Sequence, residues 1–421
     1  MKKLLFTLVC TFLCLAANGQ QKDPEVARLV QENLQRTGIV LDPYEYLPAA
    51  ETPVLAGYKA FYISHYGRHG SRSDWPADGY RGVTDKFTRA HDAGILTLQG
   101  EQAYEMIKDI FARYNDMGGR LTPRGAREHR QIAHRMYNKY KKVFRSGNRR
   151  IRAVSSTSPR CIISMAAFTG ELLSLDRKLD IGWDTGEKYM RYMSSGETPE
   201  MREMTAPVIK QNRLEHPRDT ATFLGRVFTD IAKGLEIAGL ADDFLDETLM
   251  IAVASGAFDC DDSLLRLFNE DDIYWHEANF AMTMYLRQCN SADYGHLRMA
   301  MPEVQAFLDD FTSKADEVIA SGDYVADLRF GHDTHLLAIC ARLGIKGVGE
   351  RLTAEQSLAW PGFLYSPFAG NLQAIFYRGK AGDVLVKFYI NEREATLLGL
   401  DGGPYYRWED VKAMLAKGPL K

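Results

Sequence analysis

The residues with the clearest chemical potential lie together between Arg68 and Arg72, in the order Arg-His-Gly-Ser-Arg. They follow a predicted strand, residues 61–64, and Gly67 stands just before them. Two guanidiniums can hold an oxyanion in bidentate fashion, and glycine lets the backbone approach a ligand closely. The imidazole of His69 would then lie beside the anion as a nucleophile. A polar surface turn contains the same residue types, so this segment alone does not decide between a site and a turn.

Two later segments repeat the arrangement of a strand followed at once by polar residues. A predicted strand at 151–155 leads to Arg160, in the first turn of the helix that follows. A cation at a helix N-terminus opposes the helix dipole, so Arg160 either meets an anion or points into solvent. The third predicted strand, 326–330, leads to His332 and Asp333.

The three junctions would meet in an open α/β sheet, because ligands bind there beyond the carboxyl ends of the strands. The side chains gathered would be three arginines, two histidines and one carboxyl group. This set suits phosphoryl transfer, with cations for the phosphate oxygens, a histidine nucleophile and an acid for the leaving oxygen. Since guanidiniums can take the place of a metal ion, we expect neither a metal nor a cofactor.

Apolar spacing predicts the elements that must position these residues. From residue 175 to about residue 299, strand-like runs are scarce and helical spacing dominates. We therefore expect a discontinuous α/β catalytic domain, residues 20–174 and 300–421, interrupted by a helical cap domain, residues 175–299. At 421 residues the chain is long enough for two such units. Helices are expected at 23–37, 98–114, 123–144, 161–173, 334–343 and 408–415, and a hairpin at 371–377 and 384–390.

The N-terminus has the pattern of a secretory signal peptide, residues 1–19. Two lysines precede an apolar run, and Ala17-Asn18-Gly19 forms a small-x-small cleavage site. The run is too short for a transmembrane helix, so we expect a periplasmic or secreted protein without membrane insertion. Export permits disulfides. The four cysteines outside the signal allow three pairings: Cys161, Cys260, Cys289 and Cys340.

Charge and spacing suggest three further sites, each with a simpler explanation. Residues 120–152 contain twelve Lys and Arg and one acid, Glu128, which could bind nucleic acid. However, without the signal the chain has 50 basic and 55 acidic residues, net −5, which favours a solvated face near a small polyanionic substrate. Residues 259–270 resemble a calcium loop but place Leu264 where glycine is required. His332 and His335 are a weak zinc pair, and we expect His335 to be an interior histidine with satisfied hydrogen bonds.

The combined motifs resemble the histidine acid phosphatase branch of the histidine phosphatase superfamily, which includes phytases and multiple inositol polyphosphate phosphatases. The resemblance implies a phosphoglycerate-mutase-like α/β domain interrupted by a helical domain that covers the site. It also implies that His69 attacks phosphorus to give a phosphohistidine, and that Asp333 protonates the leaving alkoxide and then assists water. Arg68, Arg72, Arg160 and His332 would bind the phosphate. The motifs are RHGSR (68–72), LTPRG (121–125), SSTSPRC (155–161), FGHDTHL (330–336) and NLQAIFY (371–377).

Two departures from the family pattern bear on the substrate. The family loop usually continues RHGxRxP, whereas here Ser73 and Asp74 follow, with Trp75-Pro76 after them. An acid at the pocket entrance would disfavour a highly anionic substrate. In addition, inositol polyphosphate phosphatases commonly carry HAE where this chain has HDT at 332–334. We expect a phosphomonoesterase acting on phytate and inositol polyphosphates, with a broad-specificity acid phosphatase for sugar phosphates as the alternative.

Two other classes fit the motifs less well. A mutase of the same superfamily would be shorter and cytosolic, and it would draw its acid from a glutamate elsewhere. A non-catalytic exported phosphate binder would need the arginines alone, whereas this chain retains both His69 and Asp333.

Overall fold

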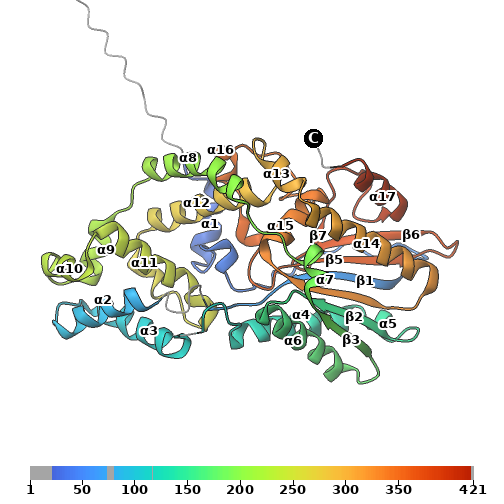
Figure 1. The fold of residues 1–421 in the computed structure, drawn as a ribbon, viewed down its shortest axis with the longest axis horizontal. Helices are drawn as coiled ribbons and strands as arrows, with labels where there is room; N and C mark the ends of the chain where they lie inside the picture. The colour runs from blue at the N-terminus through green and yellow to red at the C-terminus, as the bar shows by residue number, and fades with distance from the viewer. Residues whose placement is uncertain (1–20, 74–79, 116, 419–421) are drawn as a thin grey trace, which may run out of the picture.

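The computed structural model describes residues 21–73, 80–115 and 117–418 (Figure 1). The predicted signal peptide and Asp74, Trp75 and Pro76 lie outside the described residues. The centre of the fold is a mixed sheet with the order β3-β2-β4-β1-β5-β6-β7, and β8 pairs with β6. Its strands are β1 (Lys59–Arg68), β2 (Arg150–Ser155), β3 (Asp180–Thr185), β4 (Ala326–Gly331), β5 (Asn371–Arg378), β6 (Val384–Ile390), β7 (Arg393–Ala395) and β8 (Tyr406–Arg407).

Four strands, β3, β2, β4 and β1, run parallel, so their carboxyl ends lie along one edge. The register aligns Arg68 with Gly331 and Ser155 with Phe330, so that β1, β2 and β4 end at the same level. The hairpin β5–β6 joins the other side of β1 in the antiparallel sense. The segments that follow β1, β2 and β4 are therefore neighbours in space.

Helices cover both faces of the sheet because its central strands are apolar on both sides. On one face, Ile63 and the apolar residues of β2 and β4 pack against α4 (Pro123–Lys139), α5 (Lys141–Phe144) and α6 (Pro159–Leu175). On the other face, Tyr62 and Tyr66 pack in a core with α14 (Pro302–Ser321), α15 (Asp333–Arg342) and α17 (Trp408–Ala416). Figure 1 shows α4 and α6 below the strands and α14 and α17 above them.

A helical lobe extends from the sheet on the left of Figure 1. Phe87 of α2 meets Phe244 of α11 at a ring-centroid distance of 5.4 Å, and both rings are fully buried. The lobe consists of α2 (Arg81–Asp92), α3 (Leu98–Tyr114), α9 (Thr220–Val227), α10 (Ile231–Ala238) and α11 (Ala241–Ala254). The helices α8 (Pro199–Glu215) and α12 (Glu270–Gln288) connect it to the sheet, with α1 (Pro24–Glu32), α13 (Gly295–Met299) and α16 (Ala354–Ser357) nearby.

The structure differs from the expected division in two places. Residues 180–185, placed in the helical cap, form β3, which pairs with β2 as an edge strand of the sheet. The next helix, α7 (Glu187–Met193), packs against α14 rather than against the lobe. Conversely, α2 and α3 come from the segment assigned to the catalytic domain, yet they pack with α9, α10 and α11. The lobe is thus assembled from two separate parts of the chain.

Most predicted elements occur where their spacing placed them. The helix expected at 123–144 is interrupted at Tyr140, which separates α4 from α5, and the first helix ends at Glu32 rather than near residue 37. No helix in the described ranges is long and apolar enough to cross a bilayer. The four cysteines named above are free thiols, and three of them are buried.

Candidate active site

The parallel register of β1 and β4 brings the first and third predicted junctions together. Arg68 is the last residue of β1 and lies opposite Gly331, so His69 follows directly beside His332. The backbone N–H of His69 donates to the Gly331 carbonyl at 3.0 Å. The imidazole rings of His69 and His332 have centroids 5.7 Å apart. Two histidines far apart in sequence therefore share one site.

The hydrogen bond of His69 fixes which of its ring nitrogens carries the proton. Its Nδ1 lies 2.9 Å from the carbonyl oxygen of Gly70. Because a carbonyl only accepts, Nδ1 carries the proton and Nε2 keeps a free lone pair. Burial, together with the positive charges of Arg68 and Arg160, lowers the pKa of His69 well below its usual value. His69 is therefore a neutral imidazole, the form that can attack phosphorus.

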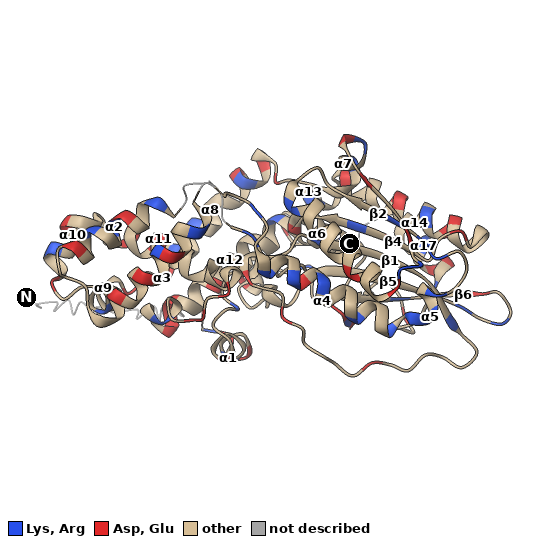
Figure 2. Ribbon diagram, turned by 90° about the horizontal axis from the view of Figure 1, so that it is seen from below, with Lys and Arg blue, Asp and Glu red and all other residues tan. Residues whose placement is uncertain are grey.

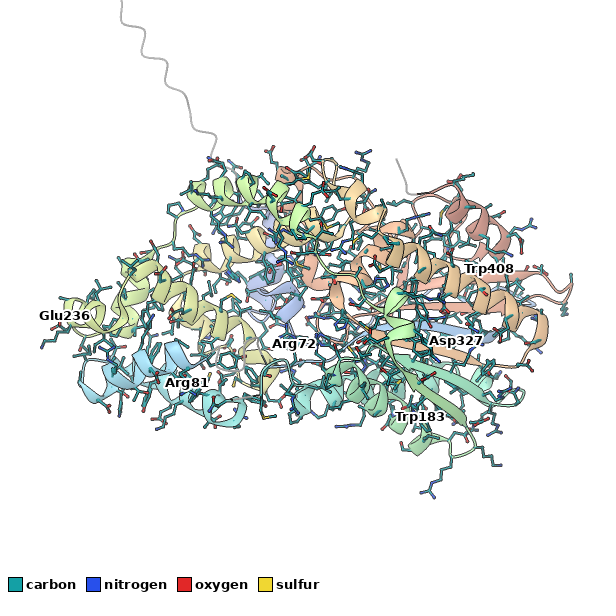
Figure 3. All side chains as sticks on the ribbon, viewed as in Figure 1. Arg72, Arg81, Trp183, Glu236, Asp327 and Trp408 are labelled. Atoms are coloured by element: carbon teal, nitrogen blue, oxygen red, sulfur yellow. The ribbon has the colours of Figure 1, made fainter. Side chains whose placement is uncertain are left out.

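Arg68 is a fully buried cation held from several sides. Its Nη1 donates to the Ser366 carbonyl at 2.9 Å, and its Nη2 lies 3.3 Å from Asp333 Oδ2. Its guanidinium carbon lies 4.6 Å from the ring centroid of Phe368, and that of Arg72 lies 6.0 Å from the same centroid. Burial lowers the pKa of Arg68 to about 10, so the group keeps its charge. Figure 3 shows Arg72 between the helical lobe and the sheet.

Arg160 and His332 form a second side of the site. Arg160 Nη2 lies 3.4 Å from His332 Nδ1, and His332 Nε2 lies 3.1 Å from Ser156 Oγ. Because a guanidinium only donates, Nδ1 accepts and Nε2–H donates to the serine. Burial and the Arg160 charge lower the pKa of His332 to about 4, so the ring is neutral. A neutral His332 adds no further positive charge beside the arginines.

Asp333 supplies the carboxyl group of the site from the first residue of α15. Burial acts to raise its pKa, but the charges of Arg68 and Arg72 outweigh that effect, and the pKa lies below the usual value. A bound phosphate would offset the charge of the arginines and so raise the pKa of Asp333 toward the range in which it can hold a proton. The carboxyl group is thus able to act as an acid when the anion site is filled.

A loop that the motifs did not single out, Ser366–Gly370, supports His69 from behind. The Ala369 N–H donates to the His69 carbonyl at 2.9 Å, and Arg68 N–H donates to the Gly370 carbonyl at 2.8 Å. Phe368 adds its ring beneath the guanidiniums. No local pattern in this segment indicates the role, which depends on its position just before β5.

Glu128, the one acid in the basic stretch, is a second supporting residue that sequence reasoning missed. Its carboxylate is buried and accepts from Ser71 N–H at 2.8 Å, from Ser71 Oγ at 2.7 Å and from Tyr44 N–H at 3.1 Å. The segment 68–72 also packs closely on α4, since a Cβ added to Gly70 would collide with the backbone of Gly125. In the sequence, the available indication of this role was that Glu128 is the one acid in a basic stretch.

We expect Glu128→Ala to weaken both the fold and the site. The change leaves the Ser71 and Tyr44 N–H groups without their acceptor, and each such buried group costs about 1–3 kcal/mol. The free energy of unfolding in urea should fall by roughly 3 kcal/mol in total, and phosphatase kcat/KM should fall with it. Glu105→Ala, at an exposed position of α3, is the matched control. Equal stability of the two variants would contradict a supporting role for Glu128.

The remaining basic residues of the stretch 120–152 are largely paired with acids of neighbouring elements. Arg135 contacts Glu392 at 2.7 Å, Arg127 contacts Asp259 at 2.5 Å, and Arg149 contacts Asp176 at 3.1 Å. Figure 2 shows acidic and basic positions interspersed over the molecule. Within the described ranges, no group of three or more His, Cys, Asp or Glu side chains is arranged to hold a metal ion.

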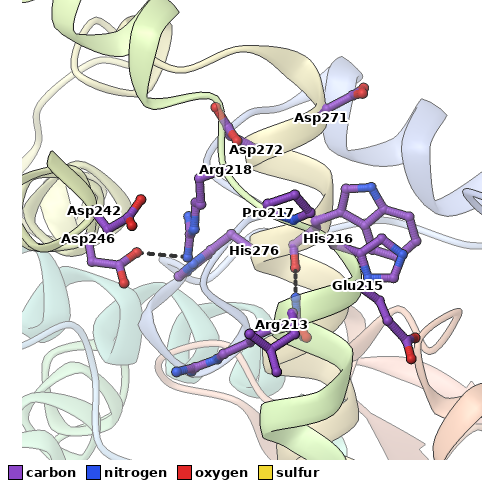
Figure 4. A pocket seen from close by; sticks show the side chains of 13 residues that line it. Arg213, Glu215, His216, Pro217, Arg218, Asp242, Asp246, Asp271, Asp272 and His276 are labelled. Atoms are coloured by element: carbon purple, nitrogen blue, oxygen red, sulfur yellow. Dashed lines mark hydrogen bonds and ion pairs between the residues drawn. The ribbon is translucent and has the colours of Figure 1, made fainter.

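A cavity of about 620 Å³ lies away from these residues, among α8, α11 and α12 (Figure 4). Arg218 reaches across it to Asp246 at 2.9 Å, and the rings of His216 and Trp275 stack with centroids 3.4 Å apart. His276 of α12 also lines it. None of the six predicted site residues does.

Comparison with known proteins finds solved structures with the same fold. No protein-family model and no curated protein matches the sequence. Among solved structures, the multiple inositol polyphosphate phosphatase of Bifidobacterium longum in complex with phosphate aligns with a TM-score of 0.68 and 17% identity, over 90% of this chain and 97% of that one. Its complex with inositol hexasulfate aligns with a TM-score of 0.64 and 16% identity, over 92% and 98%. The phytase from D. castellii gives 0.67 and 14%, over 98% and 90%. At these identities the likeness shows a shared fold, and the predicted α/β class, a sheet with helices on both faces, is confirmed.

Proposed function

We propose that this protein is a metal-independent phosphomonoesterase that works through a phosphohistidine on His69. The observation that carries the proposal is the neutral His69 with a free Nε2 beside the charges of Arg68, Arg72 and Arg160, with Asp333 paired to Arg68. The cations would hold a phosphate whose phosphorus faces Nε2. The geometry therefore favours attack on a phosphate monoester over binding alone.

The reaction proceeds in two balanced steps. His69 Nε2 attacks phosphorus and the P–O bond to the leaving group breaks, while Asp333 gives its proton to the departing oxygen. The Asp333 carboxylate then takes a proton from water, whose oxygen attacks the phosphohistidine and breaks the P–N bond. The products are an alcohol and inorganic phosphate, with His69 regenerated as a neutral ring. Throughout, the arginines stabilise the charge on the phosphoryl oxygens.

We propose inositol polyphosphates, including phytate, as the substrate class. The support is the shared fold with a protein solved with inositol hexasulfate and phosphate, and with a phytase. The departure from the family pattern after Arg72 leaves the alternative of smaller sugar phosphates open to the same assay. We further propose export by the N-terminal signal, residues 1–19, which would place the enzyme in the periplasm or outside the cell.

A substrate panel tests the proposed function. The mature chain should release phosphate from phytate, from a sugar phosphate and from nitrophenyl phosphate, with the highest kcat/KM for phytate. A chelator should leave all three rates unchanged because no step uses a metal. Higher kcat/KM for the sugar phosphate would favour the broad-specificity alternative. Binding of phosphate without any release would instead favour the non-catalytic binder.

A further inference from the structure

His335 is a buried histidine that the proposed reaction leaves unused. It lies two residues after Asp333 in the first turn of α15, and its side chain is fully enclosed. Both ring nitrogens have partners: Nδ1 lies 3.0 Å from Ser195 Oγ, and Nε2 lies 2.9 Å from the Tyr192 carbonyl. Burial lowers its pKa to about 3. His335 is therefore a neutral interior histidine, as the sequence indicated, but a fully bonded one beside the acid.

The partners of His335 fix the direction of every hydrogen bond around it. The Tyr192 carbonyl only accepts, so Nε2 carries the ring proton and Nδ1 must accept. Ser195 O–H therefore donates to Nδ1. The same serine oxygen accepts from Nη1 of Arg298 at 3.1 Å, because a guanidinium only donates. The result is a one-way chain that runs from Arg298 through Ser195 and His335 to the Tyr192 carbonyl.

Arg298 anchors the far end of this chain. Its guanidinium is fully buried, and it also donates to the Gly196 carbonyl at 3.1 Å and to the Arg287 carbonyl at 3.0 Å. It holds the Ser195–Gly196 backbone against the beginning of α15. A buried guanidinium with several backbone acceptors is a rigid fixture, since each bond lost would leave a buried donor unpaired.

The chain is tied to Asp333 through the first turn of α15. Thr334 Oγ1 donates to the Ser195 carbonyl at 2.5 Å, so Ser195 contacts both residues that follow Asp333. The side chain of Asp333 contacts Arg68, with Oδ2 at 3.3 Å from Nη2. The direction in which its carboxyl points therefore depends on the backbone of that turn.

We propose that Arg298, Ser195 and His335 form a relay of positioning residues that aims the Asp333 carboxyl at the leaving oxygen. The relay does not touch the substrate and does not transfer a proton. Ser195 holds residues 334 and 335 in place by hydrogen bonds, and Arg298 holds the Ser195–Gly196 segment in the same way. The orientation of Asp333 is fixed as a result. This inference deepens the proposed function and rests on it.

The test separates protonation of the leaving group from the rest of catalysis. An alkyl phosphate needs an acid for its leaving oxygen, whereas nitrophenyl phosphate leaves without one. The readout is kcat/KM for the alkyl ester divided by kcat/KM for the nitrophenyl ester. In Ser195→Ala and His335→Phe this ratio should fall by about tenfold, because a small misplacement of a catalytic group carries a cost of that order or larger. His335→Asn can still accept from Ser195 at the Nδ1 position and should recover most of the ratio.

The control is His276→Phe, a second histidine with a low pKa, located in the wall of the α8–α12 cavity. It should leave the ratio unchanged. Equal loss for both esters in Ser195→Ala, with an unchanged ratio, would overturn the relay, as would a ratio in His335→Asn as low as in His335→Phe. Ser195→Ala removes only one oxygen atom, from a loop. Its ratio therefore tests the proposal even if His335→Phe does not fold. If the unmutated protein released no phosphate from either ester, the proposed function would fail instead.

Discussion

Replacing His69 with alanine is expected to lower kcat/KM for every phosphomonoester by at least about 10⁴-fold, because the reaction loses its nucleophile. The remaining arginines would still bind the anion, so KM for phytate should change much less than kcat. Steady-state phosphate release and calorimetric binding of inorganic phosphate measure the two effects separately. The loss should be the same for good and poor leaving groups, since without a P–N bond neither ester can react by this route.

The control for this variant is His134→Ala, an exposed histidine of α4 that pairs with Glu171. It should retain full activity. Circular dichroism and the urea midpoint should be similar for both variants, which excludes unfolding as the cause. Activity of His69→Ala within tenfold of the unmutated protein would contradict the mechanism.

Replacing Asp333 with asparagine should be the second most damaging change, and its effect should depend on the leaving group. General acids contribute about 10²–10⁴-fold, so kcat/KM for an alkyl phosphate should fall by that factor. For nitrophenyl phosphate the fall should be less than about tenfold, since its oxygen leaves without a proton. Asp323→Asn, at an exposed position three residues before β4, is a matched control outside the site. An equal loss for both esters would mean that Asp333 is not the acid.

The pH dependence follows from the same group. The pKa of Asp333 lies below its usual value in the empty site, so the protonated fraction falls as the pH rises. The kcat/KM of the unmutated protein for alkyl phosphates should therefore be greatest under acidic conditions and decline toward neutral pH. The low pKa of His69 keeps the nucleophile neutral over the same acidic range. Asp333→Asn should lose the decline, measured with the same ester so that ionisation of the substrate cancels.

The grouping of the candidate site residues could be predicted from the sequence because the motifs that contain them are local. Arg68, His69 and Arg72 stand together after one strand, and His332 with Asp333 stands after another. The general rule that parallel strands end along one edge was then enough to bring them together. Arg160 was predictable for the same reason, since it follows β2 at the start of a helix.

The supporting residues could not be predicted, because their roles depend on long-range register. Glu128 reaches Ser71, 57 residues away, and Ser195 reaches His335, 140 residues away, and the sequence around these residues does not indicate which partners they contact. The strand β3 was missed because its sequence, DIGWDT, buries only Ile181 and shows no alternation. The separate origin of the helical lobe was equally hidden, since α2 and α3 are ordinary amphipathic helices whose partners lie over a hundred residues later.

The most direct test of the central claim is to trap the covalent intermediate. The mature protein, mixed with phytate and quenched in alkali, should yield a single phosphorylated peptide that contains His69 by mass spectrometry. Asp333→Asn should accumulate more of it from nitrophenyl phosphate, because water attack loses its base, and His69→Ala should show none. Phosphate on any other residue, or turnover by His69→Ala without an intermediate, would contradict a phosphohistidine mechanism.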